Sequence, residues 1–199
     1  MKKIPTLFKR EFSDHRVVKV LPEVTPGLEW VLVGDGTATM KVDGSCAAML
    51  GGKFYKRFDA KPGRGVPEGA IPCDDPDPVT GHWPHWVPVD WSQPADKWFV
   101  EALNNSFAVV DFAEDATYEA IGPHFQKNPY HLEKDVLVRH GQICLDGQFE
   151  RSFDGIRRYL ESHAVEGIVF WKDGEPKCKI KRTDYGFKWP VRGASASKS

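Results

Sequence analysis

The run Lys-Val-Asp-Gly-Ser that begins at Lys41 carries residue types that could form a covalent bond to a substrate. Side chains alternate along a strand, so Lys41 and Asp43 are expected on one side and Met40 on the other. Gly44 permits a tight turn or a close approach of the backbone. A lysine amine that has lost its proton is a nucleophile. The alternative for so short a motif is a solvated strand end with a surface ion pair.

A second group of charged residues begins at Lys177, where lysine alternates with apolar residues. The alternation places Lys177, Lys179 and Lys181 on one face, with Cys178 and Ile180 toward the core. Three neighbouring ammonium groups repel one another unless an anion lies opposite, and a phosphate would serve. The alternative is an edge strand that its lysines protect from aggregation.

Two carboxylates and one arginine accompany these lysines. Glu166 stands at the start of an apolar strand and is expected to share a face with Ile168. Glu119 lies within another apolar stretch, where a buried carboxylate needs partners. Arg57 follows a predicted hairpin that begins near residue 45. Taken singly, Glu166 could be an ordinary strand end and Arg57 part of an ordinary basic surface.

The elements that position these residues are mostly short apolar stretches, which predict strands. Apolar residues at helical spacing predict one helix over 95–103, with Pro94 in its first turn. A second helix is expected to end near His163, with Ser152 or Asp154 as its cap. Many strands and few helices indicate an α+β fold. The predicted strands cover residues 30–33, 38–42, 46–50, 107–112, 136–138, 168–171 and 177–181.

The chain of 199 residues is expected to form one catalytic domain over 1–192, followed by a disordered tail at 193–199. Residues 61–90 are dense in proline and glycine, which indicates a long insertion that serves a site. Cys73, His82 and His85 within it could meet at a zinc ion, but no fourth ligand at familiar spacing accompanies them.

Composition excludes several classes of protein. A formal net charge of -1 and a charged fraction of 28% do not indicate a polyanion partner over the whole surface, so any nucleic-acid site must be a local patch. The four cysteines form no CxxC pair, and no apolar leader or membrane-length segment is evident. We therefore expect a cytoplasmic protein that is not embedded in a membrane.

Read together and in order, the motifs are KVDGS, KR, TYEAIG, EGIVFW and KCKIKRTDYG. This series resembles the covalent nucleotidyltransferase superfamily of polynucleotide ligases and capping enzymes. Within it, the chain is most similar to the RNA ligase family that includes the human 5′-to-3′ RNA ligase. That resemblance rests on KVDGSCA, GHWPHWVPV, AIGPHFQKNPY and FKWP, and it covers most of the chain.

The resemblance implies a ligase adenylyltransferase core and a three-step reaction. Lys41 would attack the α-phosphorus of ATP and form a lysine-AMP bond. AMP would then pass to an RNA 5′-phosphate, and a 3′-hydroxyl would displace it. Mg²⁺, or Mn²⁺ in its place, would be held by Glu166 with Asp43. Lys179 and Lys181 would hold the phosphate and lower the proton affinity of the nucleophile.

The same resemblance implies a set of nucleotide contacts, with Glu119 at the ribose. Related ligases stack an aromatic ring on the adenine, but residues 136–141 contain no Phe, Tyr or Trp. His140 or Val138 could cover the base instead. Lys179 and Lys181 are preferred as the motif pair over the register that uses Lys177. The expected cofactor-binding residues are Met40, Asp43, Gly44, Arg57, Glu119, His140 and Lys177.

Three other activities compete with an RNA ligase. A DNA ligase or a guanylyltransferase would share the covalent chemistry, but no residues remain for the additional C-terminal domain of those enzymes. A protein that binds RNA ends and becomes AMPylated without ligating would keep the pocket alone. The expected partners are RNA ends, and the expected state is a monomer.

Overall fold

The computed structural model describes residues 3–13, 16–108 and 110–191 and divides the chain into two compact units. The first unit consists of residues 1–3 and 43–140, and the second of residues 4–42 and 141–199. The single catalytic domain expected over 1–192 stays a prediction, and the expected disordered tail lies outside the described residues.

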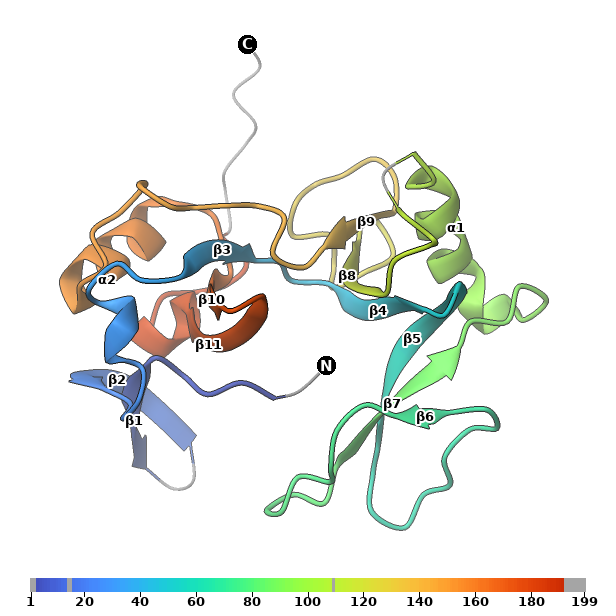
Figure 1. Ribbon diagram of the computed structural model, residues 1–199, viewed down its shortest axis with the longest axis horizontal. Coiled ribbons are helices and arrows are strands. Elements are labelled where there is room, and N and C mark those ends of the chain that lie inside the picture. The colour runs from blue at the N-terminus through green and yellow to red at the C-terminus, as the bar shows by residue number, and fades with distance from the viewer. Residues whose placement is uncertain (1–2, 14–15, 109, 192–199) are drawn as a thin grey trace. The chain divides into compact units, whose positions relative to one another are not determined.

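The first unit is built on a six-stranded antiparallel sheet with one long helix, α1 (Lys97–Asn105) (Figure 1). A 3-10 turn, η2 (Pro94–Asp96), leads into α1. Ala102 and Leu103 of α1 pack with Met49, Tyr118 and Leu137 of the sheet. The strands, in spatial order, are β6 (Ile71–Pro72), β7 (Trp83–Pro88), β5 (Lys53–Ala60), β4 (Ser45–Leu50), β8 (Ala116–Ile121) and β9 (Val136–Arg139).

The opposite face of this sheet carries the side chains that alternate with the core residues. Ala48, Tyr55 and Trp86 form a small buried cluster there, and Cys46 packs against it. The Pro-rich insertion at 61–90 contributes the two strands β6 and β7 to the sheet, and buried Trp86 of β7 packs onto the unit.

The second unit holds a three-stranded antiparallel sheet and the helix α2 (Phe153–Ser162). The sheet order is β11 (Glu175–Lys181), β10 (Gly167–Lys172) and β3 (Thr37–Lys41). The unit begins with a hairpin of β1 (Phe8–Ser13) and β2 (Arg16–Val24), followed by the 3-10 turn η1 (Glu29–Val31). A second 3-10 turn, η3 (Arg182–Tyr185), follows β11. Ile168, Phe170 and Ile180 are fully buried and pack with Ile156 and Leu160 of α2.

The ends of α2 have clear physical causes. Ser152 is the N-cap, and its hydroxyl accepts a hydrogen bond from the Gly155 amide at 3.0 Å. At the other end, the buried guanidinium of Arg182 donates to the carbonyls of Leu160, Glu161 and His163. The last carbonyls of a helix lack partners within it, so a buried cation at this end supplies donors and complements the helix dipole. The His163 carbonyl, just past the helix, also accepts from the Val165 amide at 2.9 Å.

Arg182→Met should lower the free energy of unfolding by about 2 kcal/mol, because three carbonyls at the end of α2 lose a charged donor. Urea denaturation would measure the loss. Arg158→Met is the matched control, since Arg158 lies on the same helix with its side chain 66% exposed and pairs only at the surface with Glu150. Its effect should stay within about 0.5 kcal/mol. Equal losses for the two variants would contradict the capping role of Arg182.

The mixed α/β composition, with mostly antiparallel sheets and few helices, agrees with the predicted fold class. Both predicted helices are confirmed. Among the described residues, no helix has the length and apolar character needed to cross a membrane. Five of the predicted strands are confirmed with small shifts at their ends: 38–42, 46–50, 136–138, 168–171 and 177–181.

Two strand predictions are wrong. Residues 30–33 form the 3-10 turn η1 and a following turn, because local hydrogen bonds such as that of the Val31 amide to the Leu28 carbonyl replace pairing with a neighbouring strand. The described part of 107–112 is irregular. Phe107 stacks on Phe112 with ring centroids 5.0 Å apart, which an extended strand would not allow, because it would place these residues about 17 Å apart.

Candidate active site

The three-stranded sheet of the second unit brings the predicted catalytic lysines to one face. Lys41 on β3 and Lys181 on β11 both lie opposite Gly167 on the central strand β10. Lys179 lies opposite Val169, one step along the same face. Gly167 has no side chain, so the central strand places no side chain between Lys41 and Lys181.

The opposite face of the sheet forms the core. Ile168, Cys178 and Ile180 are fully buried there, which confirms the predicted alternation along β11. Met40 packs against the same core, and Lys177 is exposed near an irregularity in the β10–β11 pairing. The nucleotide-binding roles expected of these two residues stay predictions.

Glu166 places a carboxylate directly at the predicted nucleophile. The Lys41 ammonium donates a hydrogen bond to Glu166 Oε2 at 2.5 Å, and the two side chains are 23% and 13% exposed. The strand β10 begins only at Gly167, so the alternation that would place Glu166 with Ile168 does not extend to it. The low exposure of both side chains shields the ion pair from water, and the exposed part of Lys41 leaves its amine within reach of a substrate.

Arg10 joins this group, although the sequence motifs do not reveal it. Its Nη2 donates to Asp184 Oδ1 at 3.1 Å, and its buried Nε has no hydrogen-bond partner among the described residues. Asp184 Oδ2 accepts from the Lys181 amide at 2.8 Å, so this carboxylate connects the arginine to the end of β11. We call Arg10, Lys41, Lys179 and Lys181 the cationic cluster.

Positive charge is in excess in the cationic cluster: Lys41 pairs with Glu166 and Arg10 pairs with Asp184, and Lys179 and Lys181 add two more cations. Lys179 shows the effect: burial first, and then the charges of Lys41, Lys181 and Arg10, lower its pKa from 10.5 to about 8. Glu166 acts in the opposite direction but does not cancel these effects. An anion placed here would relieve the repulsion.

The backbone around Lys179 bears on the alternative of a lysine-protected edge. The Lys179 amide donates to the Pro5 carbonyl at 3.0 Å, and its carbonyl accepts from the Leu7 amide at 2.8 Å. Both backbone groups are thus already paired with the N-terminal segment. At Lys179 the strand is therefore not an open edge, so the interpretation of this lysine as protection against aggregation does not apply here.

The lowered pKa of Lys179 makes stability depend on pH in a defined direction. Between pH about 8 and about 10.5 the unfolded chain keeps a proton that the folded protein has lost. The free energy of unfolding of the wild type should therefore rise across this window relative to Lys179→Met. Below pH about 8 the destabilising charge is fully present. Urea titrations of both proteins at several pH values measure the difference, and a flat or falling difference would contradict the assignment.

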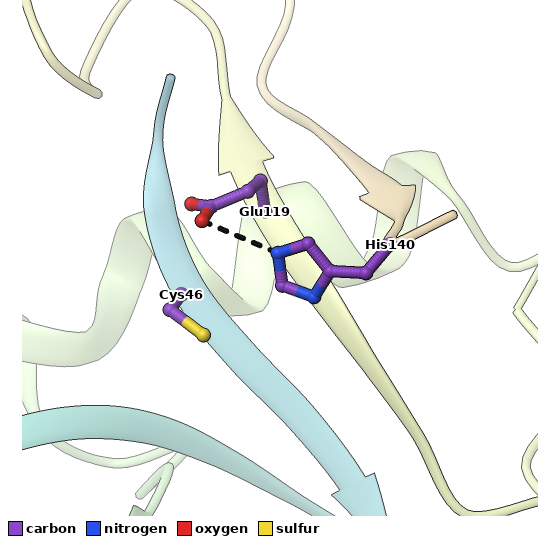
Figure 2. A group of neighbouring side chains, drawn as sticks. All are labelled: Cys46, Glu119 and His140. Carbon is purple, nitrogen blue, oxygen red and sulfur yellow. Dashed lines mark hydrogen bonds and ion pairs between the residues drawn. The ribbon is translucent and has the colours of Figure 1, made fainter. Parts of the chain in front are cut away.

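In the first unit, Glu119 and His140 lie together on the sheet face opposite α1 (Figure 2). His140 Nε2 is 3.3 Å from Glu119 Oε1, and His140 Nδ1 is 2.8 Å from the Thr117 hydroxyl. Both predicted nucleotide contacts are mostly buried, with 12% of the Glu119 side chain and 14% of the His140 side chain exposed. Cys46, which the sequence did not single out, faces them from β4.

The remaining predicted residues of the first unit have individual positions. The Asp43 amide donates to the Tyr130 hydroxyl at 2.7 Å. A Cβ at Gly44 would lie 2.3 Å from the Ala120 carbonyl oxygen, so β8 approaches as closely as only glycine permits. Arg57 Nε donates to Asp59 Oδ1 at 2.9 Å.

The alternative zinc site is not assembled. Among the described residues, Cys73, His82 and His85 do not form a group with metal-ligand spacing, and buried His85 instead has Nδ1 2.9 Å from the Trp83 carbonyl. Of the site residues predicted from the sequence, the second unit brings together Lys41, Glu166, Lys179 and Lys181. The first unit brings together Glu119 and His140.

Comparison with known proteins relates the chain to an RNA ligase. No family model matches the chain. A zebrafish (Danio rerio) protein described as RNA ligase 1 is 30% identical over 139 residues, in an alignment that covers 56% of this chain and 43% of that protein. The similarity thus involves about half of this chain and spans less than half the length of the relative.

Proposed function

We propose that this protein is an ATP-dependent RNA ligase that forms a lysine-AMP intermediate at Lys41. The observation that carries the proposal is the Lys41–Glu166 pair, set in an excess of positive charge on one face of a sheet. Similarity to a protein named RNA ligase 1 supports the choice of RNA ends as substrate. On this proposal the chain has the nucleotidyltransferase core that its motifs resemble.

The first step needs a lysine that can lose its proton. Lys179, Lys181 and Arg10 place positive charge near Lys41, where the anionic phosphates of ATP would bind. Glu166 accepts a hydrogen bond from the amine and holds it in one orientation. The neutral amine then attacks the α-phosphorus of ATP, a nitrogen–phosphorus bond forms, and the bond to pyrophosphate breaks.

The cationic cluster would serve the same step electrostatically. Lys179 and Lys181 are proposed to contact the α-phosphate, where negative charge develops as pyrophosphate leaves. Arg10 has one buried Nε–H with no hydrogen-bond partner in the described part of the chain, so it has a donor to offer a phosphate oxygen. Water alone would shield the phosphate charge less effectively than these fixed cations.

A divalent metal fits the chemistry of the donors. Glu166 offers hard carboxylate oxygens at the site of attack, which suit Mg²⁺ or Mn²⁺, and the resemblance adds Asp43 as a second ligand. The metal, when bound, would neutralise phosphate charge. Glu119, Arg57 and His140 are proposed to contact the nucleotide.

The remaining steps transfer the activated phosphate. The RNA 5′-phosphate attacks the lysine-AMP phosphorus, which releases Lys41 and leaves an adenylylated RNA end. A 3′-hydroxyl then attacks the RNA phosphorus, and AMP leaves with the bonding electrons. A bare phosphate monoester has no comparable leaving group, so prior activation accounts for the need for ATP.

Incubation with α-labelled ATP and Mg²⁺, followed by a denaturing gel, tests the first step. The protein should carry a label that survives denaturation and disappears when 5′-phosphorylated RNA with a 3′-hydroxyl end is added. Parallel reactions with RNA and DNA of the same sequence test the substrate. Absence of label with every nucleotide would refute the covalent mechanism, and DNA sealed as well as RNA would favour a DNA ligase. Label without sealing would identify a protein that is AMPylated but does not ligate.

A further inference from the structure

Cys46, Glu119 and His140 bring three metal-ligand atoms together in the first unit. Their sulfur, carboxylate oxygen and imidazole nitrogen all lie within 4.8 Å of one another. Cys46 on β4 is directly opposite Glu119 on β8, and Glu119 is opposite Val138 on β9, two residues before His140. Figure 2 shows the three side chains turned toward a common space between them. Strand pairing therefore fixes the group.

Glu119 is incompletely satisfied within this group. Its Oε2 is buried and has no hydrogen-bond partner among the described residues, and its Oε1 meets only the long 3.3 Å contact to His140. A buried carboxylate oxygen without a partner costs free energy that a cation beside it would offset. This unpartnered oxygen is an observation independent of the spacing of the three residues.

His140 is oriented for ligation by its second nitrogen. Nδ1 is 2.8 Å from the Thr117 hydroxyl, so an Nδ1–H that donates there leaves the Nε2 lone pair facing the Glu119 carboxylate. Two acceptors that face each other need a proton or a cation between them. Hydrogen bonds of this kind to the far nitrogen are the usual support of metal-binding histidines.

We propose that Cys46, Glu119 and His140 bind a zinc ion through Sγ, a carboxylate oxygen and Nε2, with the fourth position open. Sulfur, nitrogen and oxygen donors in this number are typical of zinc sites that keep a place for water or substrate. On binding, the Cys46 thiol gives its proton to solvent and its sulfur bonds to the metal. Mg²⁺, which prefers oxygen ligands, is not expected here.

The Cys46 thiol keeps its proton in the apo site, so a bound metal must displace that proton. Burial first, and then the Glu119 charge, raise the pKa of the Cys46 thiol to about 12. Arg57 acts in the opposite direction. Without a metal the thiol is therefore neutral and unreactive at physiological pH. A zinc ion would stabilise the thiolate and pair with Glu119 at the same time.

The inference goes beyond the proposed function and needs no nucleotide. One consequence does rest on that function: Glu119 and His140 are proposed nucleotide contacts, so bound zinc should compete with ATP. Zinc would then inhibit labelling of Lys41 in the wild type and have a weaker effect on Cys46→Ser. Direct metal binding is measured separately, so the two proposals can fail independently.

Cobalt is the probe that tests the site, because a thiolate bound to Co²⁺ gives a charge-transfer band that zinc lacks. The untagged chain of 199 residues, freed of metal by a chelator and dialysed, is titrated with Co²⁺ in the absence of nucleotide. The wild type should develop the band with one equivalent, and Zn²⁺ should abolish it by displacement. Lys41→Arg should bind equally well, since Lys41 belongs to the other unit.

The variants separate this site from other cysteines. Cys46→Ser should lose the band, whereas Cys144→Ser, which removes an exposed thiol of the second unit, should keep it. Glu119→Gln and His140→Gln should each weaken affinity at least about tenfold while retaining the fold, as circular dichroism would check. A wild type without the band, or a Cys46→Ser protein that keeps it, overturns the proposal.

Discussion

Replacing Lys41 with arginine should abolish the covalent label from ATP while leaving the fold intact. Arginine keeps a positive charge beside Glu166, so the ion pair that Lys41 makes at 2.5 Å can persist. A guanidinium does not lose its proton in proteins and cannot act as the nucleophile. Labelling should fall more than about 10³-fold, equivalent to more than about 4 kcal/mol of transition-state stabilisation.

Lys172→Arg is the matched control for this experiment. Lys172 lies in the same sheet, on β10, and pairs with Asp35 at 2.8 Å, away from the cationic cluster. Its replacement should leave the rate of labelling within about twofold, a difference of less than about 0.5 kcal/mol. Label that persists in Lys41→Arg would place the AMP on another residue and remove the basis of the mechanism.

Replacing Gly167 with alanine should damage both stability and activity. A Cβ at this position would lie 2.4 Å from the Ile180 carbonyl oxygen and 3.0 Å from the Lys181 Cα. Both are backbone atoms of the neighbouring strand, so β11 must move away from β10. We expect a loss of about 3 kcal/mol in the free energy of unfolding. Labelling should fall as well, because Lys181 and Lys41 lie on either side of Gly167.

Gly65→Ala is the control, since a Cβ there meets no atom within 4 Å and its φ is not positive. Urea denaturation and the labelling assay should find this variant close to the wild type. If Gly167→Ala were as stable and as active as Gly65→Ala, the two strands could separate without effect, and the fixed spacing of the lysines would not matter.

The sequence predicts which side chains are buried and which are exposed wherever a strand or helix has regular periodicity. Alternation along 177–181 correctly separates the lysines from buried Cys178 and Ile180. Helical spacing and the capping residue Ser152 correctly locate α2. In both cases the information is local, because a period of two or of 3.6 fixes which side chains share a face. The nucleotide-binding and metal-binding roles of the site residues stay predictions.

Contacts between distant segments could not be predicted in the same way. Arg10 meets Asp184 across 174 positions of sequence, and no motif surrounds the arginine to indicate it. Cys46 and Glu119 become neighbours only through the β4–β8 register. The failure at 30–33 has a related cause: the apolar residues are present, but no strand lies beside them to supply hydrogen bonds.

The division of the chain also sets an order for folding during synthesis. Apart from residues 1–3, the first unit is one continuous stretch, Asp43–His140, and all six strands of its sheet emerge from the ribosome before residue 141. In the second unit, β3 cannot form its sheet until β10 and β11 have been synthesised more than 120 residues later. Loop closure over that distance is slow and leaves apolar surface exposed meanwhile. The lysine face of the sheet is therefore among the last parts of the protein to form, and nascent chains that stop before β11 should lack it.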